Sequence, residues 1–394
     1  MKKSLLIIAA LNIFLFSIDA KAQKTATTLE KVSTQLDYAL QEIAKAKLKS
    51  PALISPRSMR SDTLYLVPAK DWTSGFFSGN LWYMYELTKD EKWLQKAKEY
   101  TASLEGEKRN GRTHDMGFKM YCSFGNGYRL TKDPKYREIL IESAHTLTTR
   151  FNKKIEAIRS WDHHADQWDF PVIIDNMMNL ELLFWAFKET NDSLYYKVAV
   201  SHANTTMKNH FRPDFSTYHV VGYDVNTGKA IKKNTHQGYN DASAWARGQG
   251  WGLYGYTMCY RETGKKEYLK LADNIANFIL KNKTLPKDLV PFWDFNDPAI
   301  PNAPRDASAA ALMASAFYEL STYVPKKSKY YRQVADKMMN SLSSTYSSKP
   351  LTNGGFLLTS STGDHSSLTE INTSIIYADY YYIEALLRQK NLTK

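Results

Sequence analysis

Two aspartates stand at the start of long apolar segments, where a carboxyl group can take part in acid–base chemistry. Asp115 lies just before the apolar segment 117–130, and Asp175 directly precedes the apolar segment 176–187. When two carboxyl groups lie close together in apolar surroundings, one of them has a raised pKa and keeps its proton near neutral pH. Such a pair can act as general acid and base on a sugar. The alternative is that each Asp only caps free N–H groups at the start of a helix.

A single arginine lies between two tryptophans in the stretch WARGQGW, residues 245–251. Arg247 follows Trp245 by two residues and precedes Trp251 by four. A guanidinium held between aromatic rings can bind a carboxylate through two parallel hydrogen bonds. The alternative is a structural ion pair, for example with Asp241. The residue types predict either an anion-binding arginine or a buried structural one.

Further polar and aromatic residues precede the apolar segments. Tryptophans offer flat faces on which sugar rings stack, and histidines can contact a ligand or serve as ordinary structural residues. The candidates of these types are Trp72, Trp161, Trp245, Trp251, His114, His219 and His236.

His163 and His164, with Asp162, Asp166 and Asp169, imitate a metal site, but no pair of histidines four residues apart on a helix accompanies a Glu. We therefore predict a solvated loop and no metal site there. The chain also lacks the G-x-S-x-G turn of serine hydrolases and a phosphate-binding glycine loop, which disfavours both of those classes.

A repeated pattern along the chain predicts how these residues are positioned. Helical segments that are apolar on every face alternate with helices that are apolar on one side only, which is typical of an inner layer wrapped by an outer layer. We therefore predict an all-α (α/α)6 barrel formed by a single domain, residues 23–394; an open helical solenoid is the alternative. If the inner helices all run in the same direction, the candidate residues gather at one rim. The inner segments are 79–87, 117–130, 176–187, 250–262, 308–320 and 374–387.

Composition and the N-terminus limit the possible classes of protein. The 394 residues carry a net charge of +12, but the basic residues are scattered among acidic ones, so a nucleic-acid partner is not favoured. Cys122 and Cys259 lie in apolar helical segments, which predicts buried free thiols.

Residues 1–22 combine two lysines, an apolar run and an Ala-Lys-Ala site, as signal peptides do. We expect an exported, periplasmic protein with no membrane attachment after cleavage.

Several motifs together resemble the unsaturated glucuronyl hydrolases of glycoside hydrolase family 88. The resemblance covers nearly all of the chain after the N-terminal segment, and the (α/α)6 barrel of that family agrees with the six predicted pairs. It implies an exo-acting enzyme that removes a 4,5-unsaturated uronic acid from the non-reducing end of oligosaccharides made by polysaccharide lyases. In this family the C4=C5 bond is hydrated, and no metal or organic cofactor is implied. The motifs lie at residues 72–82, 113–118, 173–186, 235–256, 291–311 and 377–388.

The resemblance also implies roles for individual residues. Asp175 matches the general acid/base of the family and Asp115 its second essential aspartate. Gln237 and Arg247 are implied to bind the uronate carboxylate together. The remaining matched pocket positions are His219, Trp245 and Trp251, with Trp72, Phe76 and Trp161 as aromatic walls.

One departure from the family pattern concerns the choice of substrate. Asn372 stands where an Asp is usual, in a loop, residues 359–373, that differs between members of the family. The identity of the second sugar and the tolerance of sulfate therefore stay open. Two alternatives remain at this point: a related unsaturated rhamnogalacturonyl hydrolase that acts on pectin fragments, and a non-catalytic sugar-binding protein of an uptake system.

Overall fold

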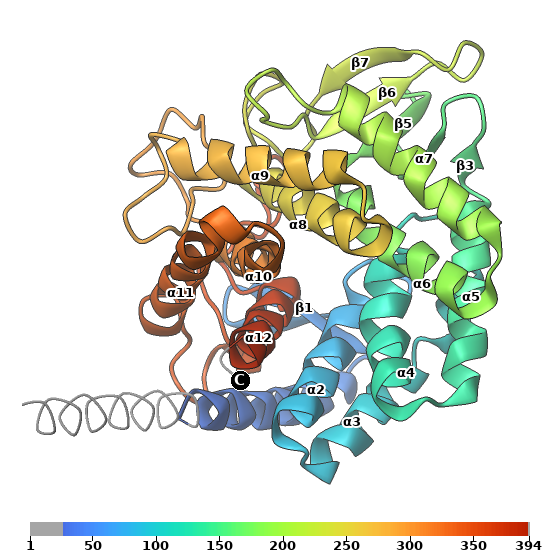
Figure 1. The fold of residues 1–394 in the computed structure, drawn as a ribbon. Coiled ribbons are helices and arrows are strands. Elements are labelled where there is room, and N and C mark those ends of the chain that lie inside the picture. Colours follow the sequence, from blue (N-terminus) through green and yellow to red (C-terminus); the bar gives the residue numbers. More distant parts are fainter. Residues whose placement is uncertain (1–26, 393–394) are drawn as a thin grey trace, which may run out of the picture.

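The inner layer of the protein is a closed ring of six helical segments. A computed structural model describes residues 27–392, so the expected signal peptide, residues 1–22, lies outside the described residues. Each inner segment packs against the next, and the last packs against the first, which closes the ring (Figure 1). The predicted (α/α)6 barrel is confirmed. The segments are α2 (Ser74–Thr88), η2 (Gly117–Gly125) with α4 (Asn126–Thr131), η3 (Ile174–Asn179) with α6 (Leu180–Thr190), α8 (Ala246–Thr263), α10 (Ala307–Tyr323) and α12 (Ile376–Asn391).

The outer layer consists of one-sided helices that cover the ring. In α9, for example, Tyr268, Leu271, Ile275 and Ile279 are buried at helical spacing, while the opposite face is solvated. The helix over residues 27–47 completes this layer, because the amide of Gln35 binds the backbone of the segment that leads into α12. The other outer helices are α3 (Glu91–Ala102), α5 (Pro134–Thr148), α7 (Ser193–Asn209), α9 (Lys266–Lys281) and α11 (Ser328–Ser344).

The first three turns between inner and outer helices share one design. The residue after the inner helix has a positive φ, which ends that helix, and the following Asp accepts a 2.9 Å hydrogen bond from the N–H two residues further on. This Asp starts the outer helix as its N-cap. The residue pairs are Lys89–Asp90, Lys132–Asp133 and Asn191–Asp192.

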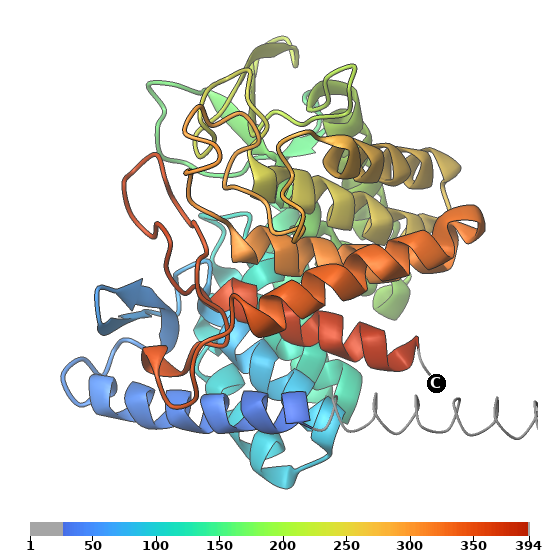
Figure 2. The same ribbon diagram turned by 90° about the vertical axis from the view of Figure 1, so that its left-hand side faces the viewer.

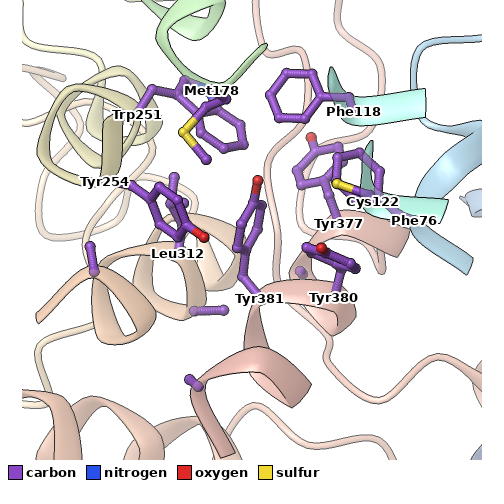
Figure 3. Close-up of a cluster of buried hydrophobic side chains, with 14 of the residues drawn as sticks. Phe76, Phe118, Cys122, Met178, Trp251, Tyr254, Leu312, Tyr377, Tyr380 and Tyr381 are labelled. Carbon is purple, nitrogen blue, oxygen red and sulfur yellow. The ribbon is translucent and has the colours of Figure 1, made fainter. Parts of the chain in front are cut away.

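Aromatic and aliphatic side chains from the inner helices form a buried cluster inside the barrel (Figure 3). Close approach of the helices depends on glycine at particular positions. A Cβ at Gly75 would lie 2.3 Å from the carbonyl oxygens of Phe118 and Lys119, and one at Gly255 would lie 2.5 Å from the Cβ of Met177. Substitution at either glycine would therefore force neighbouring inner helices apart.

The second and third inner segments differ from the predicted uninterrupted α-helices. The second begins as the π-helix η2, and the third begins as the 3-10 helix η3, which contains Asp175. Departures of this kind from α-helical geometry are frequent at functional sites. The side chain of Asp175 forms no capping hydrogen bond, so the interpretation of Asp175 as a helix cap is wrong.

Short strands and long loops gather at the end of the barrel where the inner helices begin (Figure 2). β1 (Ser55–Arg60) pairs with β2 (Thr63–Val67), and β3 (Phe151–Asn152) with β4 (Ala157–Ile158). β5 (Phe170–Ile173), β6 (Val220–Tyr223) and β7 (Ala230–Asn234) form an antiparallel sheet in that order. β5 leads directly into η3, so this sheet helps to fix the position of Asp175.

Two smaller expectations also concern the helices. Cys122 and Cys259 are buried free thiols, as predicted. Within residues 27–392, no helix is both long and apolar enough to span a membrane.

Candidate active site

Asp175 is a buried carboxyl group without an ordinary partner. It is 9 % exposed, and its Oδ2 atom forms no hydrogen bond to any residue that the structure describes. Burial raises the pKa of Asp175 to about 7, and the nearby charge of Asp115 raises it further, while Arg247 and the Trp251 side chain oppose the shift. Burial is thus a larger cause than the neighbouring carboxylate. At neutral pH a substantial fraction of Asp175 keeps its proton, as a general acid requires.

His219 faces this carboxyl group in a defined tautomer. Its Nδ1 accepts hydrogen bonds from the backbone N–H groups of His236 and Gln237, each at 3.1 Å. The ring proton therefore lies on Nε2, 3.8 Å from Oδ2 of Asp175. Burial lowers the pKa of His219 well below its usual value, so the ring is neutral. Neither Nε2 nor Oδ2 has a hydrogen-bond partner among residues 27–392, so both atoms are available to a ligand.

Asp115 is oriented by its neighbours in the chain. The hydroxyl of Thr113 donates a 2.6 Å hydrogen bond to Oδ2, and Nε2 of His114 lies 3.2 Å from Oδ1. Burial lowers the pKa of His114, partly opposed by Asp115, so His114 is a neutral residue that positions the carboxylate. The influence of Asp115 on the pKa of Asp175 agrees with the prediction that both lie at one rim.

Arg247 occupies the centre of a buried network, and this changes its predicted role. Its Nη1 donates to Asp306 at 2.8 Å and to the carbonyl of Thr362, while Nη2 donates to the carbonyl of Gly363. The predicted partner Asp241 is wrong; the ion pair forms with Asp306 at the start of α10. Both Nη atoms of the guanidinium are thus bound to protein. Among residues 27–392, Nε and the remaining N–H of Nη2 have no hydrogen-bond partner, which leaves this side edge for a substrate carboxylate.

Gln237 lies beside Arg247, as predicted, but it also binds protein. Its Nε2 donates to the carbonyl of Gly363 at 3.1 Å. In this structure both residues anchor the loop over residues 359–373. Their joint role in binding a uronate carboxylate stays a prediction.

The predicted aromatic walls are only partly accessible. Trp72 and Trp161 are partly exposed, Trp245 is almost buried, and Trp251 and Phe76 have no exposed surface. Phe76 contacts Trp72 at 5.9 Å between ring centroids, so it supports that ring from within the core and does not form the wall itself. Trp245 packs on His219 at 4.6 Å and fixes the position of its ring.

Tyr377 is a site residue that the sequence did not reveal. It is the second residue of α12, and its buried hydroxyl forms no hydrogen bond within the described part of the chain, residues 27–392. Its ring lies 5.1 Å from that of Trp72 and 5.3 Å from the guanidinium carbon of Arg247. Its position in the sequence could have indicated this role, because the site residue Arg247 is also the second residue of an inner helix, α8.

The loop over residues 359–373 closes one side of the site. Its Glu370 accepts hydrogen bonds from Nε and Nη2 of Arg57, at 2.7 and 3.2 Å, and from Ser58 at 3.1 Å, all on β1. Arg57 in turn lies 6.0 Å from the ring of Trp72. The loop is thus tied to the rim strand beside a predicted sugar-stacking residue. Asn372 adopts a positive φ of 51° in this loop.

The pKa of Asp175 predicts the pH dependence of turnover. If Asp175 is the general acid, its protonated form carries the proton to be donated, so kcat/KM should be constant below about pH 7 and fall as Asp175 ionises above it. His219 is expected to add no limb near neutrality, because its lowered pKa keeps it neutral there. A kcat/KM profile measured across this range checks the expectation, and a rate that stays constant well into the alkaline range would contradict it.

Comparisons with known proteins agree with this geometry. The family model "Glycosyl Hydrolase Family 88" matches residues 54–384. An unsaturated glucuronyl hydrolase of Formosa agariphila is 46% identical, over 100% of this chain and 99% of its own. An unsaturated chondroitin disaccharide hydrolase of Streptococcus pneumoniae is 32% identical, over 93% of this chain and 92% of its own.

Solved structures give the same result. The crystal structure of an unsaturated glucuronyl hydrolase specific for heparin superposes with a TM-score of 0.87 at 46% identity, over 92% of this chain and 98% of the other. A variant of the Streptococcus agalactiae enzyme in complex with dGlcA-GalNAc6S superposes with a TM-score of 0.74 at 29% identity, over 91% and 90% of the two chains. The chain is therefore a glycosidase that belongs to glycosyl hydrolase family 88.

Proposed function

We propose that the protein is an exo-acting unsaturated glucuronyl hydrolase that releases the 4,5-unsaturated uronic acid from glycosaminoglycan-derived oligosaccharides. The observation that carries this proposal is Asp175, a buried acid with a pKa of about 7 whose Oδ2 atom has no partner among the described residues. Relatives named for this activity align with the whole chain. A non-catalytic sugar-binding protein would have no need of a buried, partly protonated carboxyl group beside a second carboxylate.

The proposed reaction uses the reactivity of the substrate's own enol ether. Asp175 donates its proton to C4, and the positive charge that develops at C5 is stabilised by the ring oxygen. Water then adds to C5 and returns a proton to the Asp175 carboxylate, which acts as the base in this step. The resulting hemiketal opens to a ketone at C5, and the hemiacetal formed at C1 expels the second sugar. Asp115 binds ring hydroxyls, and the neutral His219 donates a hydrogen bond from Nε2.

Isotope labels test this course of bond formation. In heavy water, deuterium is expected at C4, and in oxygen-18 water the label is expected at C5. The substrate should be an unsaturated disaccharide made by a glycosaminoglycan lyase, and loss of its ultraviolet absorbance reports turnover. Oxygen-18 at C1 without deuterium at C4 would instead demonstrate direct glycosidic hydrolysis. Turnover of rhamnogalacturonan fragments alone would replace this proposal with the pectin alternative.

We further propose that residues 1–22 direct export and are removed before Gln23, which leaves a single domain over residues 23–394 in the periplasm. The charged, apolar and small-residue regions of this segment support the proposal. The mass of the protein recovered from the periplasm tests it, since a chain that retains residues 1–22 or stays in the cytoplasm would contradict it.

A further inference from the structure

A cavity inside the barrel is separate from the catalytic site. It has a volume of about 200 Å³ and is lined by residues of five of the six inner segments. It reaches Asn391, the last residue of α12, whereas Asp175 lies at the start of its own inner segment. The cavity therefore extends toward the end of the barrel opposite the catalytic rim.

A layer of aromatic rings separates the cavity from the catalytic site. Phe118 and Tyr381 line the cavity, and their ring centroids lie 5.3 and 5.6 Å from that of Trp251. The other side of this layer faces the catalytic site, because the Trp251 side chain influences the pKa of Asp175. The catalytic and substrate-binding candidates named above, all within residues 27–392, lie outside the lining of the cavity.

Three polar atoms of the lining are available to a ligand. Tyr381 is only 2 % exposed, yet neither its hydroxyl nor that of Tyr121 forms a hydrogen bond to residues 27–392. Figure 3 shows the Tyr381 hydroxyl directed toward Met178, which also lines the cavity. Glu181 accepts a hydrogen bond from Arg261 at Oε1, and its Oε2 has no such partner in the described part of the chain. The lining thus offers two hydroxyls and one carboxylate oxygen.

The arginines at the cavity are already bound by protein groups. Arg388 pairs with Glu319 at 2.7 Å and donates to the hydroxyl of Tyr254 at 2.8 Å. Arg129 donates from both Nη atoms to the carboxylate of Glu86. An anionic ligand would have to break these pairs and leave a carboxylate without its partner, which is costly.

Ion pairs connect Glu181 to a network with an excess of negative charge. The network contains four carboxylates and three cations, namely Glu181, Glu262, Glu319, Glu384, Arg261, Arg388 and Lys188. Burial raises the pKa of Glu181, Arg261 opposes the shift, and the other three carboxylates raise the pKa further. With all members ionised, one negative charge is left without a cation. The free oxygen of Glu181 is the place where a further positive charge is best accommodated.

We propose that this cavity is a binding site for a small molecule that carries a primary ammonium group. The ammonium donates to Oε2 of Glu181, and the tyrosine rings of the lining favour a cation over a neutral group. The hydroxyls of Tyr121 and Tyr381 bind the other polar groups of the ligand. A compact amino sugar and a short aliphatic amine both offer this chemistry. The inference does not depend on the proposed function, because the two sites share no residue.

Calorimetry tests the site with D-glucosamine, its neutral analogue D-glucose, and the aliphatic diamine putrescine. Near neutral pH, at least one of the two amines should bind the wild-type protein about 10-fold more tightly than D-glucose does. Binding of putrescine alone would identify an aliphatic amine as the ligand, and binding of D-glucosamine alone an amino sugar. In E181Q the preference over D-glucose should be lost, and in Y381F the amine should bind more weakly.

Two matched controls should bind the amine as the wild type does. E189Q changes a carboxylate of the same helix, α6, that pairs with Arg137 at 3.1 Å outside the cavity. Y318F removes a hydroxyl from an equally buried tyrosine, which donates to Asp336 at 2.7 Å outside the cavity. Thermal melting of each variant verifies that it is folded.

The affinity for the amine should also depend on pH. A cation binds the ionised form of Glu181, so the wild-type affinity should fall as the pH is lowered from about 7 to about 5, and this dependence should be absent in E181Q. Equal affinity for D-glucose and both amines in the wild type, or unchanged amine binding in folded E181Q, would overturn the proposal. If E181Q does not fold, the wild-type comparison and Y381F decide the matter.

Discussion

Replacing Asp175 with Asn is expected to reduce kcat by roughly 10²–10⁴-fold while the protein stays folded. Asn has the same shape, but its amide cannot donate a proton to C4 or accept one from water. KM should change little, because Asp175 acts on the reacting atoms. Steady-state kinetics on an unsaturated disaccharide, with circular dichroism to check helix content, measures both effects.

The same substitution should increase thermal stability near neutral pH. The folded-state pKa of Asp175 is raised to about 7, whereas the unfolded chain ionises near the ordinary value of 3.8. Between pH 3.8 and about 7, the carboxyl group of Asp175 ionises in the unfolded chain but stays protonated in the folded protein. Ionisation therefore stabilises the unfolded state, and Asp175 destabilises the protein increasingly as the pH rises toward 7. The gain in Tm on Asp175→Asn should therefore be larger at neutral than at acidic pH.

A matched control lies further along the same inner segment, in the first turn of α6. Glu181 in α6 is also a carboxyl group with a raised pKa, but it pairs with Arg261 away from the rim. Glu181→Gln should leave kcat close to that of the wild type. Near-normal turnover by folded Asp175→Asn, or an equal loss in Glu181→Gln, would remove Asp175 from its proposed role.

Replacing Arg247 with Lys is expected to weaken substrate binding by about 1–3 kcal/mol and to lower stability as well. A single ammonium group cannot keep the bonds to Asp306, Thr362 and Gly363 and also offer a planar edge to a carboxylate. Breaking a buried ion pair is costly because one charge is left without its partner. The effect should be seen as an increased KM on an unsaturated disaccharide, together with a lower Tm.

Arg388→Lys separates the effect on binding from the effect on stability. Arg388 is likewise a largely buried arginine that pairs with Glu319 and donates to the carbonyl of Ser315, near the C-terminal end of α12. Its replacement should lower Tm without changing KM. An Arg247→Lys enzyme with wild-type KM would show that Arg247 only anchors the loop over residues 359–373 and does not bind the substrate carboxylate.

The barrel could be predicted from the sequence because its cause is local in the chain. About 15 consecutive residues determine whether a helix is apolar on all faces or on one face. The two kinds of helix predict two layers, and their six alternations predict six pairs. The turns also follow a local rule, which the structure shows: Asp133, for example, follows the residue that ends one helix and caps the next. Asp115 and Asp175 were identified for the same reason, by their place just before inner segments.

Only the tertiary structure decided which side chains meet across those segments. Arg247 pairs with Asp306, 59 residues away, and not with nearby Asp241. His236 joins His163 and His164, which residue type alone assigned to a solvated loop. The 3-10 start of the segment containing Asp175 also escaped detection, because an apolar pattern predicts burial and not the hydrogen-bond spacing of the helix. Electrostatic and hydrogen-bond partners depend on distance in space, and sequence periodicity determines only the face from which each residue projects.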